Sequence, residues 1–432
     1  MDMLRGIGVM RRDPPRFLAE CAERFGPVVS FPIPRSTVLY LADPVDVRRV
    51  LQGNHPAYGK RTIQYDSLSL VTGHGLLASD GELWRRMRRI VQPAFHHELI
   101  AQMADAIQQP TERMRRRWES REASRAFDLD QEMLTLTLEV VGATLFGAAM
   151  GREAASLVDA VRGALHVVVS RSQQPLKPPS WLATPGSRRL AHSLRQLDGA
   201  VDRLIVARRL TPLSEDALSL LLKARDEGIA TDAEVRNEVV TLIVAGHETV
   251  AATMTWTWLL LASDRAVEAR LHAEVDALPS GPWGAEVIDR LPYTRAVIDE
   301  CLRLYPPAWV ITRKSLVADE VGGYHVPPAS TLIMSPYLLH RDASLWDAPD
   351  RFDPDRFAVD ARLGPDRASY IPFGAGPRLC IGRDLSLFEA PLIVAALARA
   401  FTVRPLEPHR VRRDFGVTLR PRGGVAARVL AR

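Results

Sequence analysis

One loop holds the residue with the clearest capacity for chemistry. Cys380 lies in the stretch Phe373–Gly382, FGAGPRLCIG, together with three glycines and Arg378. Glycines let a backbone fold close enough for amide N–H groups to point at a sulfur. Such hydrogen bonds, a nearby cation and the start of a following helix stabilise a thiolate, which is the form that binds metals. A free cysteine is usually a buried structural residue, but these neighbours favour a metal ligand.

The other cysteines do not extend this site. The chain has three, Cys21, Cys301 and Cys380, and they are far apart. An odd number without a C-x-x-C pair disfavours a disulfide framework, a zinc site and an iron–sulfur site. This usage is typical of a protein in a reducing cytoplasm, and we expect a cytoplasmic location.

A second polar feature interrupts an apolar stretch. Glu248 and Thr249 place a carboxylate and a hydroxyl in the segment 231–263, whose middle is otherwise nearly apolar. A carboxylate and an alcohol side by side can relay a proton. The alternative is a threonine whose hydroxyl bonds to the carbonyl four residues earlier in the helix.

These residues carry a resemblance to a known family. The loop matches F-x-x-G-x-R-x-C-x-G at every defined position and resembles the haem-binding signature of the cytochrome P450 family. In the correct order, Glu300–Arg303 resembles the family's E-x-x-R motif and Ala245–Thr249 its oxygen-activation motif. The segment around Arg356 resembles the downstream meander, although it reads Pro-Asp-Arg-Phe where the family has Pro-Glu-Arg-Phe. The resemblance covers the chain from about residue 13 to residue 432.

The resemblance implies haem b, with its iron bound by the Cys380 thiolate. Thiolate donation favours O–O cleavage more than a neutral histidine would. The haem propionates need Arg, His or Trp donors, and Trp84 and Arg88 lie one helical turn apart, as in the family's W-x-x-x-R pair. The expected cofactor contacts are Trp84, Arg88, Ala245, Arg313, Phe373, Gly374, Arg378, Cys380 and Gly382.

By the same resemblance, Thr249 and Glu248 are the expected catalytic pair. His247, between Gly246 and Glu248, is expected to be packed in the protein and not to bind iron. Glu300 and Arg303, at i and i+3 of a helix, can pair, and the resemblance places them in a buried network with Arg356. We assign these three to folding and to support of the cysteine loop. The alternative is that Glu300 and Arg303 form an exposed ion pair that contributes little to stability.

Substrate contacts are implied at four places along the chain. They are the 59–79 segment, the central helix near residue 244, the turn 308–311 and the C-terminal region near residue 417. Because this lining is apolar, a hydrophobic substrate is expected. The expected contacts, each of which is otherwise a core residue, are Tyr65, Leu68, Leu76, Val244, Trp309, Val310 and Val417.

The elements that must position these residues are mostly helices. Asp13-Pro14 predicts a helix to Phe25, and further helices are expected at 43–51, 80–91, 97–118, 129–146, 152–171, 188–209 and 384–400. The longest helix begins at Thr231, which forms a capping box with Glu234. Short strands are predicted at 28–31, 38–41, 310–314, 324–326 and 331–334, with hairpin-like strands after residue 402, and a loop is predicted from Gly53 to Ser79.

These elements indicate a mainly α protein, a helical bundle with small β-sheets. The resemblance implies the cytochrome P450 fold, with haem buried between the long central helix and the cysteine-loop helix. No strand–helix–strand rhythm supports a parallel sheet. The Pro-rich segment 173–187 is read as a surface loop, not a linker, because the flanking helices need a shared core. We therefore expect a single domain over residues 1–432.

Composition agrees with an ordinary folded protein. The 432 residues are 47% hydrophobic and 25% charged, with a net charge of +5. These values exclude wholesale disorder and collagen-like architecture. Both charge signs are mixed along the chain, so nucleic-acid binding is not expected. The longest apolar run, 239–262, is interrupted by Gly246, His247 and Glu248, so no membrane span is expected. We also expect a monomer.

The resemblance implies a monooxygenase that inserts one atom of O2 into a C–H or C=C bond of a hydrophobic small molecule. The chain has no room for a flavin or iron–sulfur domain, so electrons must come from a ferredoxin or flavodoxin with its NAD(P)H reductase. A terpenoid or polyketide of secondary metabolism is the expected substrate class. The rival functions are a peroxygenase or isomerase using the same haem, and a non-catalytic haem or ligand-binding protein. The presence of both Glu248 and Thr249 disfavours these rivals.

Overall fold

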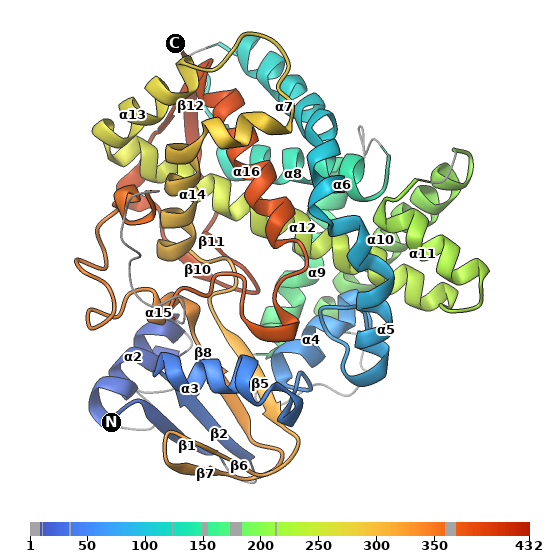
Figure 1. The fold of residues 1–432 in the computed structure, drawn as a ribbon, viewed down its shortest axis with the longest axis vertical. Helices are drawn as coiled ribbons and strands as arrows, with labels where there is room; N and C mark the ends of the chain where they lie inside the picture. The colour runs from blue at the N-terminus through green and yellow to red at the C-terminus, as the bar shows by residue number, and fades with distance from the viewer. Residues whose placement is uncertain are drawn as a thin grey trace.

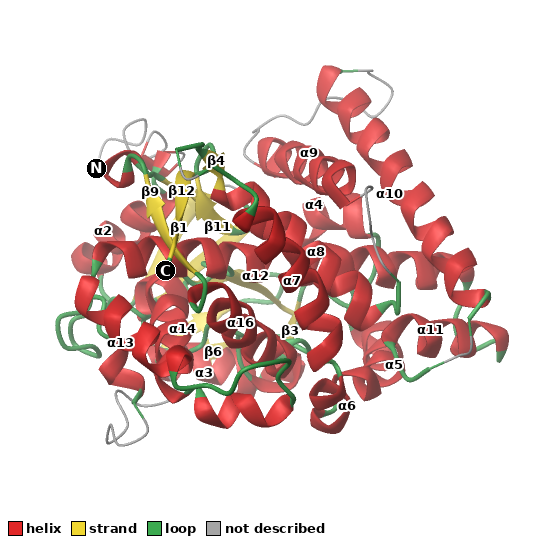
Figure 2. Ribbon diagram, turned by 90° about the horizontal axis from the view of Figure 1, so that it is seen from above, coloured by secondary structure: helices red, strands yellow, loops and turns green. Residues whose placement is uncertain are grey.

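A small β-sheet at one end supports a larger body of helices (Figure 1). In the computed structural model the described residues are 9–10, 12–33, 36–122, 124–148, 154–172, 184–211, 214–358 and 369–432. Helices dominate both views, and the strands gather in small groups (Figure 2). The prediction of a mainly α protein with small β-sheets is confirmed. Most of the Pro-rich segment, residues 173–183, lies outside the described part.

The largest sheet begins with the predicted hairpin, β1 (Val28–Ile33) and β2 (Ser36–Leu41). Helix α2 (Pro14–Phe25) precedes it, and the Asp13 side chain caps that helix by accepting from the Arg16 N–H. The strand order is β1-β2-β8-β5-β3, and only the β2–β8 pair is parallel. The added strands are β3 (Tyr58–Gly59), β5 (Ile311–Ser315) and β8 (Thr331–Met334).

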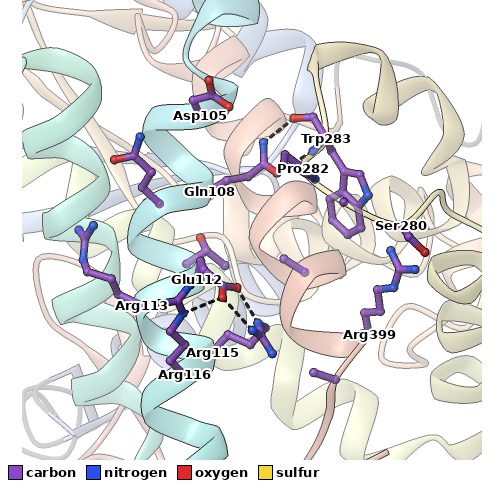
Figure 3. Close-up of a pocket in the computed structure, with 15 residues that line it drawn as sticks. Asp105, Gln108, Glu112, Arg113, Arg115, Arg116, Ser280, Pro282, Trp283 and Arg399 are labelled. Atoms are coloured by element: carbon purple, nitrogen blue, oxygen red, sulfur yellow. Dashed lines mark hydrogen bonds and ion pairs between the residues drawn. The ribbon is translucent and has the colours of Figure 1, made fainter.

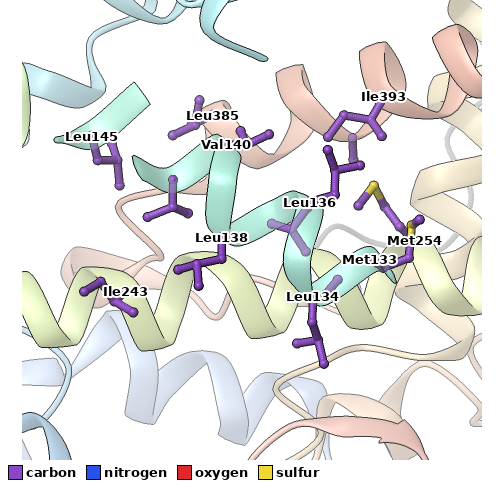
Figure 4. Packing of buried hydrophobic residues seen from close by; sticks show 14 of the residues in the cluster. Met133, Leu134, Leu136, Leu138, Val140, Leu145, Ile243, Met254, Leu385 and Ile393 are labelled. Atoms are coloured by element: carbon purple, nitrogen blue, oxygen red, sulfur yellow. The ribbon is translucent and has the colours of Figure 1, made fainter. Parts of the chain in front are cut away.

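The longest helix, α12 (Asp232–Ser263), crosses the middle of the molecule, and its capping box is present. It packs along α8 (Leu129–Leu145), whose residues Leu134, Leu136 and Leu138 are fully buried (Figure 4). A Cβ on Gly246 would come within 2.8 Å of the Val141 side chain. The contact between these two helices therefore needs glycine at position 246 for close approach.

The other helices surround this pair. They are α3 (Pro44–Arg48), α4 (Ile63–Thr72), α5 (Gly81–Val91), α6 (His97–Gln102), α7 (Ala104–Glu119), α9 (Ala154–Ser172), α10 (Pro185–Arg209), α11 (Ala217–Asp226), α13 (Arg265–Asp276), α14 (Pro292–Leu304), α15 (Pro336–Leu339) and α16 (Arg383–Ala398). Most of the predicted helix ranges agree with the structure within two or three residues, whereas α11, α13 and α15 are not predicted and α14 is expected only as the helix that carries Glu300 and Arg303. The predicted helix 43–51 is divided in the structure. Its first part is α3, and a wider π-helical turn, Arg49–Gly53, follows.

The predicted loop from Gly53 to Ser79 is wrong in its middle, where α4 lies. Polar residues within this helix interrupt the periodic pattern of hydrophobic residues that would predict a helix. Its buried side chains are nevertheless spaced like one helical face, with Tyr65, Leu68 and Val71 three residues apart. Packing of α4 against α9 and α12 stabilises a helix that its sequence alone does not indicate.

The C-terminal strands belong to two sheets and not to one hairpin-like unit. The strands β10 (Arg413–Phe415) and β11 (Leu419–Pro421) pair as a hairpin, whereas β12 (Ala426–Ala431) pairs with β9 (Phe401–Pro405) and β4 (Phe127–Asp128). One more pair, β6 (Asp319–Val321) with β7 (Tyr324–Val326), completes the described sheets.

Within the described residues, α12 is the one helix that is long and apolar enough to cross a membrane. In its most apolar window of 18 residues, 83% of the residues are buried inside the protein. The apolar character of α12 is therefore accounted for by its place in the core.

Candidate active site

The cysteine loop is anchored before α16 by its own backbone. The Cys380 N–H donates to the Phe373 carbonyl (3.0 Å), and the Gly374 N–H donates to the Ile371 carbonyl (3.0 Å). Gly376 has a φ of +71°, and a Cβ there would lie 2.1 Å from the Leu51 carbonyl oxygen. Glycine is thus required at 376 both for backbone conformation and for contact with the π-helical turn.

The Cys380 thiol is accessible, yet protein surrounds it closely enough to raise its pKa. The Gly382 N–H and the positive charges of Arg88 and Lys60 oppose this rise in pKa, because they favour the thiolate. These contacts favour the charged form that a thiolate ligand takes, although burial still raises the pKa of the thiol in this structure.

Two of the predicted arginines form contacts at this loop. One belongs to α5 and the other is part of the loop itself. Arg88 donates to the Leu379 carbonyl (2.9 Å), which ties α5 to the residue before the cysteine. Arg378 donates to the Ser79 carbonyl (3.0 Å) and pairs with Asp80. Its guanidinium also stacks on the Trp84 ring, 4.3 Å from the centroid. Trp84 therefore orients a cation of the site in this structure.

Lys60 is a buried cation that sequence reasoning missed. Only 7% of the residue is exposed, and its Nζ donates to the Leu77 carbonyl (3.0 Å). Burial, together with the charges of Arg313 and Arg378, holds the pKa of Lys60 well below its usual value. Arg313 is also buried, at 6% exposed, and donates to the Thr312 carbonyl (2.9 Å). No local pattern marks Lys60, because its partners come from distant parts of the chain.

The charges of this group are not balanced by protein. Lys60, Arg88, Arg313 and Arg378 interact with one another, and Asp80 is the one carboxylate among the contacts described for them. Like charges held together in a buried place destabilise the fold unless an anion joins them. A ligand with two carboxylates fits this arrangement, and the two propionates of haem are such a pair. The donor set thus fits haem, with the Cys380 thiolate available for its iron.

A narrow strip of α12 is accessible within the core. From residue 238 to residue 258, the only partly accessible positions are Ala245, Gly246 and Thr249. The Thr249 hydroxyl donates to the Ala245 carbonyl (2.7 Å), so the alternative of a back-bonded threonine describes its present hydrogen bond. Both residues nevertheless lie on the one face of the helix middle that a ligand can reach.

Glu248 and His247 point elsewhere. The Glu248 carboxylate is buried and accepts from Arg420 (3.0 Å) and from the Thr418 hydroxyl (3.1 Å). His247 is fully buried, its Nδ1 lies 2.6 Å from the Ile243 carbonyl oxygen, and burial lowers its pKa. A ring in that position is a packed side chain, as expected for His247.

The three predicted support residues lie together behind the loop. Glu300 and Arg303 are fully buried and share two hydrogen bonds of 2.6 and 2.8 Å, and Arg356 approaches Glu300 at 3.5 Å. His340, which no sequence pattern marked, extends this network. Its Nε2 accepts from the Ile371 N–H at 2.9 Å, and burial lowers its pKa to about 3, which keeps it a neutral acceptor. The network thereby reaches the start of the cysteine loop.

The predicted substrate contacts fall into two groups. Val310 and Val417 are partly accessible, whereas the other five are buried. Trp309 is fixed by a hydrogen bond from its indole N–H to the Gly416 carbonyl (2.9 Å). Tyr65 lies among the cations, with Lys60 over its ring. The buried residues among the predicted contacts are Tyr65, Leu68, Leu76, Val244 and Trp309.

A separate groove of about 840 Å³ lies between α7, the 280–283 turn and the end of α16 (Figure 3). Its arginines are mostly paired, for example Arg115 and Arg116 with Glu112. It touches the last turn of α16 and the residues after it, Ala396, Arg399 and Ala400, which lie about 20 Å along the helix from its start at Arg383, at 1.5 Å per residue. It is not part of the cysteine site. The described residues also contain no cluster of three or more His, Cys, Asp or Glu that could bind a metal.

Comparisons with known proteins identify a family and a fold. A family model described as Cytochrome P450 matches residues 4–425. Cyclooctatin synthase of Streptomyces melanosporofaciens is 37% identical, with 94% of this chain and 88% of the relative covered. Pentalenene oxygenase of Streptomyces avermitilis is 32% identical, with 91% and 88% covered. The crystal structure of CYP175A1 from Thermus thermophilus superimposes with a TM-score of 0.77 at 30% identity, covering 97% of this chain and 96% of that one.

Proposed function

Because the chain belongs to the cytochrome P450 family and similar proteins are named as a monooxygenase and an oxygenase, we propose that it binds haem b through Cys380 and oxygenates a hydrophobic small molecule. One observation supports this most strongly. Four cations, Lys60, Arg88, Arg313 and Arg378, gather with a single carboxylate beside an accessible thiol. A dianionic cofactor with an iron that takes a thiolate matches both halves of that arrangement.

Each residue then has a role that its contacts support. The haem supplies the redox chemistry of dioxygen when bound. The cations hold its propionates, Phe373 and Gly374 shape the loop, and the Gly382 N–H tunes the sulfur through its hydrogen bond. Ala245 and Thr249, on the accessible strip of α12, would border the space for substrate, and the Thr249 hydroxyl would hand on a proton after leaving its present bond to the Ala245 carbonyl.

The substrate class is proposed from the relatives and the lining. Two similar proteins are named for cyclooctat-9-en-7-ol and pentalenene oxygenation. Val310 and Val417, the accessible members of the predicted lining, are apolar. We propose an apolar terpenoid of secondary metabolism. A screen of such compounds for conversion of the haem from low to high spin tests this point without requiring turnover.

Electrons are proposed to come from an acidic ferredoxin or a flavodoxin with its reductase. The expected docking surface lies at α5 beside the cysteine loop, and its arginines differ in availability. Arg86 pairs with Glu234, whereas Arg89 is exposed and has no ion pair among the described contacts. Arg89→Glu should slow reduction several-fold and flatten its dependence on ionic strength, more than Arg86→Glu does. Equal rates for both variants and the wild type at low salt contradict this docking surface.

The thiolate assignment is tested by Cys380→Ser and Cys380→His. The reduced carbonyl complex of the wild type should show the Soret band typical of thiolate ligation, and both variants should lose it, with part of the haem retained in Cys380→His. Cys301→Ser is the matched control, because that thiol is fully buried and donates to the Thr253 carbonyl. Retention of the band in Cys380→Ser overturns the assignment. Consumption of O2 coupled to NAD(P)H then separates a monooxygenase from a haem-binding protein.

A further inference from the structure

Two polar side chains in the first half of α12 are buried without a hydrogen-bond partner among the described residues. Glu238 is 1% exposed and Thr241 is 3% exposed. Neither carboxyl oxygen of Glu238 makes a hydrogen bond there, and the Thr241 hydroxyl makes none either. Buried polar groups nearly always have partners, because a group without one destabilises the fold. The packing of the protein alone therefore gives no reason for a carboxyl group at this place.

Thr241 differs from the other four threonines of the same helix. In those, the hydroxyl donates to the carbonyl four residues earlier, as is usual for a threonine within a helix; they are Thr249, Thr253, Thr255 and Thr257. The corresponding carbonyl for Thr241 belongs to Asn237, and Gly75 lies against both groups. A Cβ on Gly75 would be 2.8 Å from that carbonyl oxygen and 2.1 Å from the Thr241 hydroxyl. The Thr241 hydroxyl is thus not used by its own helix.

The acid lies beside a residue of the proposed substrate lining. Leu76, one of the predicted substrate contacts, follows Gly75 in the segment that packs on this part of α12. The Leu76 N–H favours the ionised form of Glu238, but it completes no hydrogen bond with either carboxyl oxygen. A polar group that still lacks a partner therefore borders an otherwise apolar lining.

Glu238 also shares a helix face with the accessible strip of α12. At about 100° per residue, positions 238, 245 and 249 lie within about 40° of one another around the helix axis. Position 238 is about 16 Å along the axis from Thr249, at 1.5 Å per residue. A substrate that lies along this face with its reacting carbon near Thr249 therefore turns its other end toward Glu238.

The surroundings of Glu238 favour a hydroxyl group as the partner. Burial, with the neighbouring charge of Glu234, raises the pKa of Glu238 to about 7, and no cation is among the groups that shift it. An ammonium group would have to leave water for an acid that is often protonated at neutral pH, which is unfavourable. A hydroxyl both donates and accepts, so it can pair with either form of the acid and with the Thr241 hydroxyl.

We propose that Glu238 and Thr241 bind a hydroxyl group that the substrate already carries at the end remote from the carbon to be oxidised. This inference rests on the proposed function and narrows its substrate class, because the terpenoid is then an alcohol and not a hydrocarbon. A reaction that adds a hydroxyl group must therefore precede the one that this protein catalyses.

Terpenoids that differ only in one polar group test the proposal. Farnesol and geranylgeraniol are each compared with the hydrocarbon that lacks the hydroxyl and with the amine that replaces it. Each compound is titrated into the haem-loaded protein, and the dissociation constant is obtained from the change of spin state. In the wild type, at least one alcohol should bind about tenfold more tightly than its hydrocarbon, as expected for one hydrogen bond in a buried site.

Four variants assign that preference to particular groups. Glu238→Met, which keeps the length of the side chain, should remove the preference, whereas Glu238→Gln should retain most of it because the amide still donates and accepts. Thr241→Val should lower the preference about threefold. Thr255→Val is the matched control, because the Thr255 hydroxyl is buried and donates to the Ala251 carbonyl, and it should leave the preference unchanged.

Stability of the ligand-free protein gives an independent measurement. Glu238→Met removes a buried group without a hydrogen bond, so its thermal unfolding midpoint should be at least as high as that of the wild type. A lower midpoint, together with an undiminished preference for the alcohol, shows that Glu238 serves the fold and overturns the proposal.

Other results also contradict it. Equal binding of alcohol and hydrocarbon by the wild type, tighter binding of the amine than of the alcohol, or no spin change with either alcohol each overturns the proposal. Failure of the proposed function is distinct, since it appears as the absence of the thiolate-type band in the reduced carbonyl complex, and that band forms without any terpenoid.

Discussion

Two groups of charged side chains flank the cysteine loop and are built in opposite ways. Behind the loop, Arg303 makes five hydrogen bonds, to Glu300 and to the carbonyls of His340, Pro349 and Arg351. Those bonds use every donor that a guanidinium has. The donors of Arg303 at the centre of the support network are therefore all used without a ligand.

Beside the loop, the cation group has hydrogen-bond donors that have no partner among the described contacts. Its members are Lys60, Arg88, Arg313 and Arg378. The Lys60 ammonium has one hydrogen bond among the described contacts, and Arg313 uses only one of its terminal nitrogens. The difference teaches that burial of charge has two uses in this molecule. A satisfied network supports the fold, and an unsatisfied one marks where an anion binds.

The largest expected effect comes from breaking the support network. Glu300→Gln should leave the Arg303 charge buried and uncompensated, so the free energy of unfolding of the ligand-free protein should fall by about 3–5 kcal/mol. Denaturant unfolding measures this. Glu407→Gln is the control, because its partner Arg410 is exposed and the pair should contribute at most about 1 kcal/mol. Equal effects for the two variants contradict the distinction between a support network and a surface pair.

Lys60→Met should act in the opposite direction. Removing a buried amine from a group of cations should raise the free energy of unfolding of the ligand-free protein by at least about 1 kcal/mol, given its strongly lowered pKa. The same change should weaken haem binding, measured as haem retained after reconstitution. Lys223→Met, at an exposed position of α11, should alter neither. A less stable variant with undiminished haem binding shows that Lys60 belongs to the support of the fold.

The pH dependence sharpens the same contrast. Because the folded protein holds the pKa of Lys60 below that of the unfolded chain, the unfolded state binds more protons in between, and stability rises with pH there. The window runs from the lowered pKa up to about 10.4. The stability gap between Lys60→Met and the wild type should therefore shrink as pH rises from 7 to 10. Unfolding curves of both proteins across that range check this, and a constant gap contradicts it.

The smallest effect on stability is expected at Thr249, on the accessible strip of α12. Thr249→Ala should change stability by at most about 0.7 kcal/mol, in the stabilising direction. It should still lower product per NAD(P)H and raise hydrogen peroxide, while haem content and the spin shift survive. Thr255→Ala, another back-bonded threonine of this helix, is the control and should keep coupling. Unchanged coupling in Thr249→Ala means that its hydroxyl only bonds the helix backbone.

The features that could be predicted from the sequence are those that depend on residues adjacent in the chain. The cysteine loop and the capping box at Thr231 are local patterns, and both are present in the structure. Sequence reasoning missed Lys60, His340 and Arg420, whose meaning depends on contacts with residues far away in the chain. It missed α4 for a related reason, since that helix is stabilised by its neighbours and not by its own pattern.

The spread of the cation group along the chain has a consequence for biosynthesis. Lys60 is made early and Arg378 late, and Gly376 rests against the backbone of Leu51. At 5–20 residues per second, about 15–60 s separate the first of these cations from the last on the ribosome. The complete anion-binding group therefore exists only after Arg378 has been made. Capture of a cofactor by all four cations cannot come before that point, and until then the charges of Lys60 and Arg88 lack part of the final site.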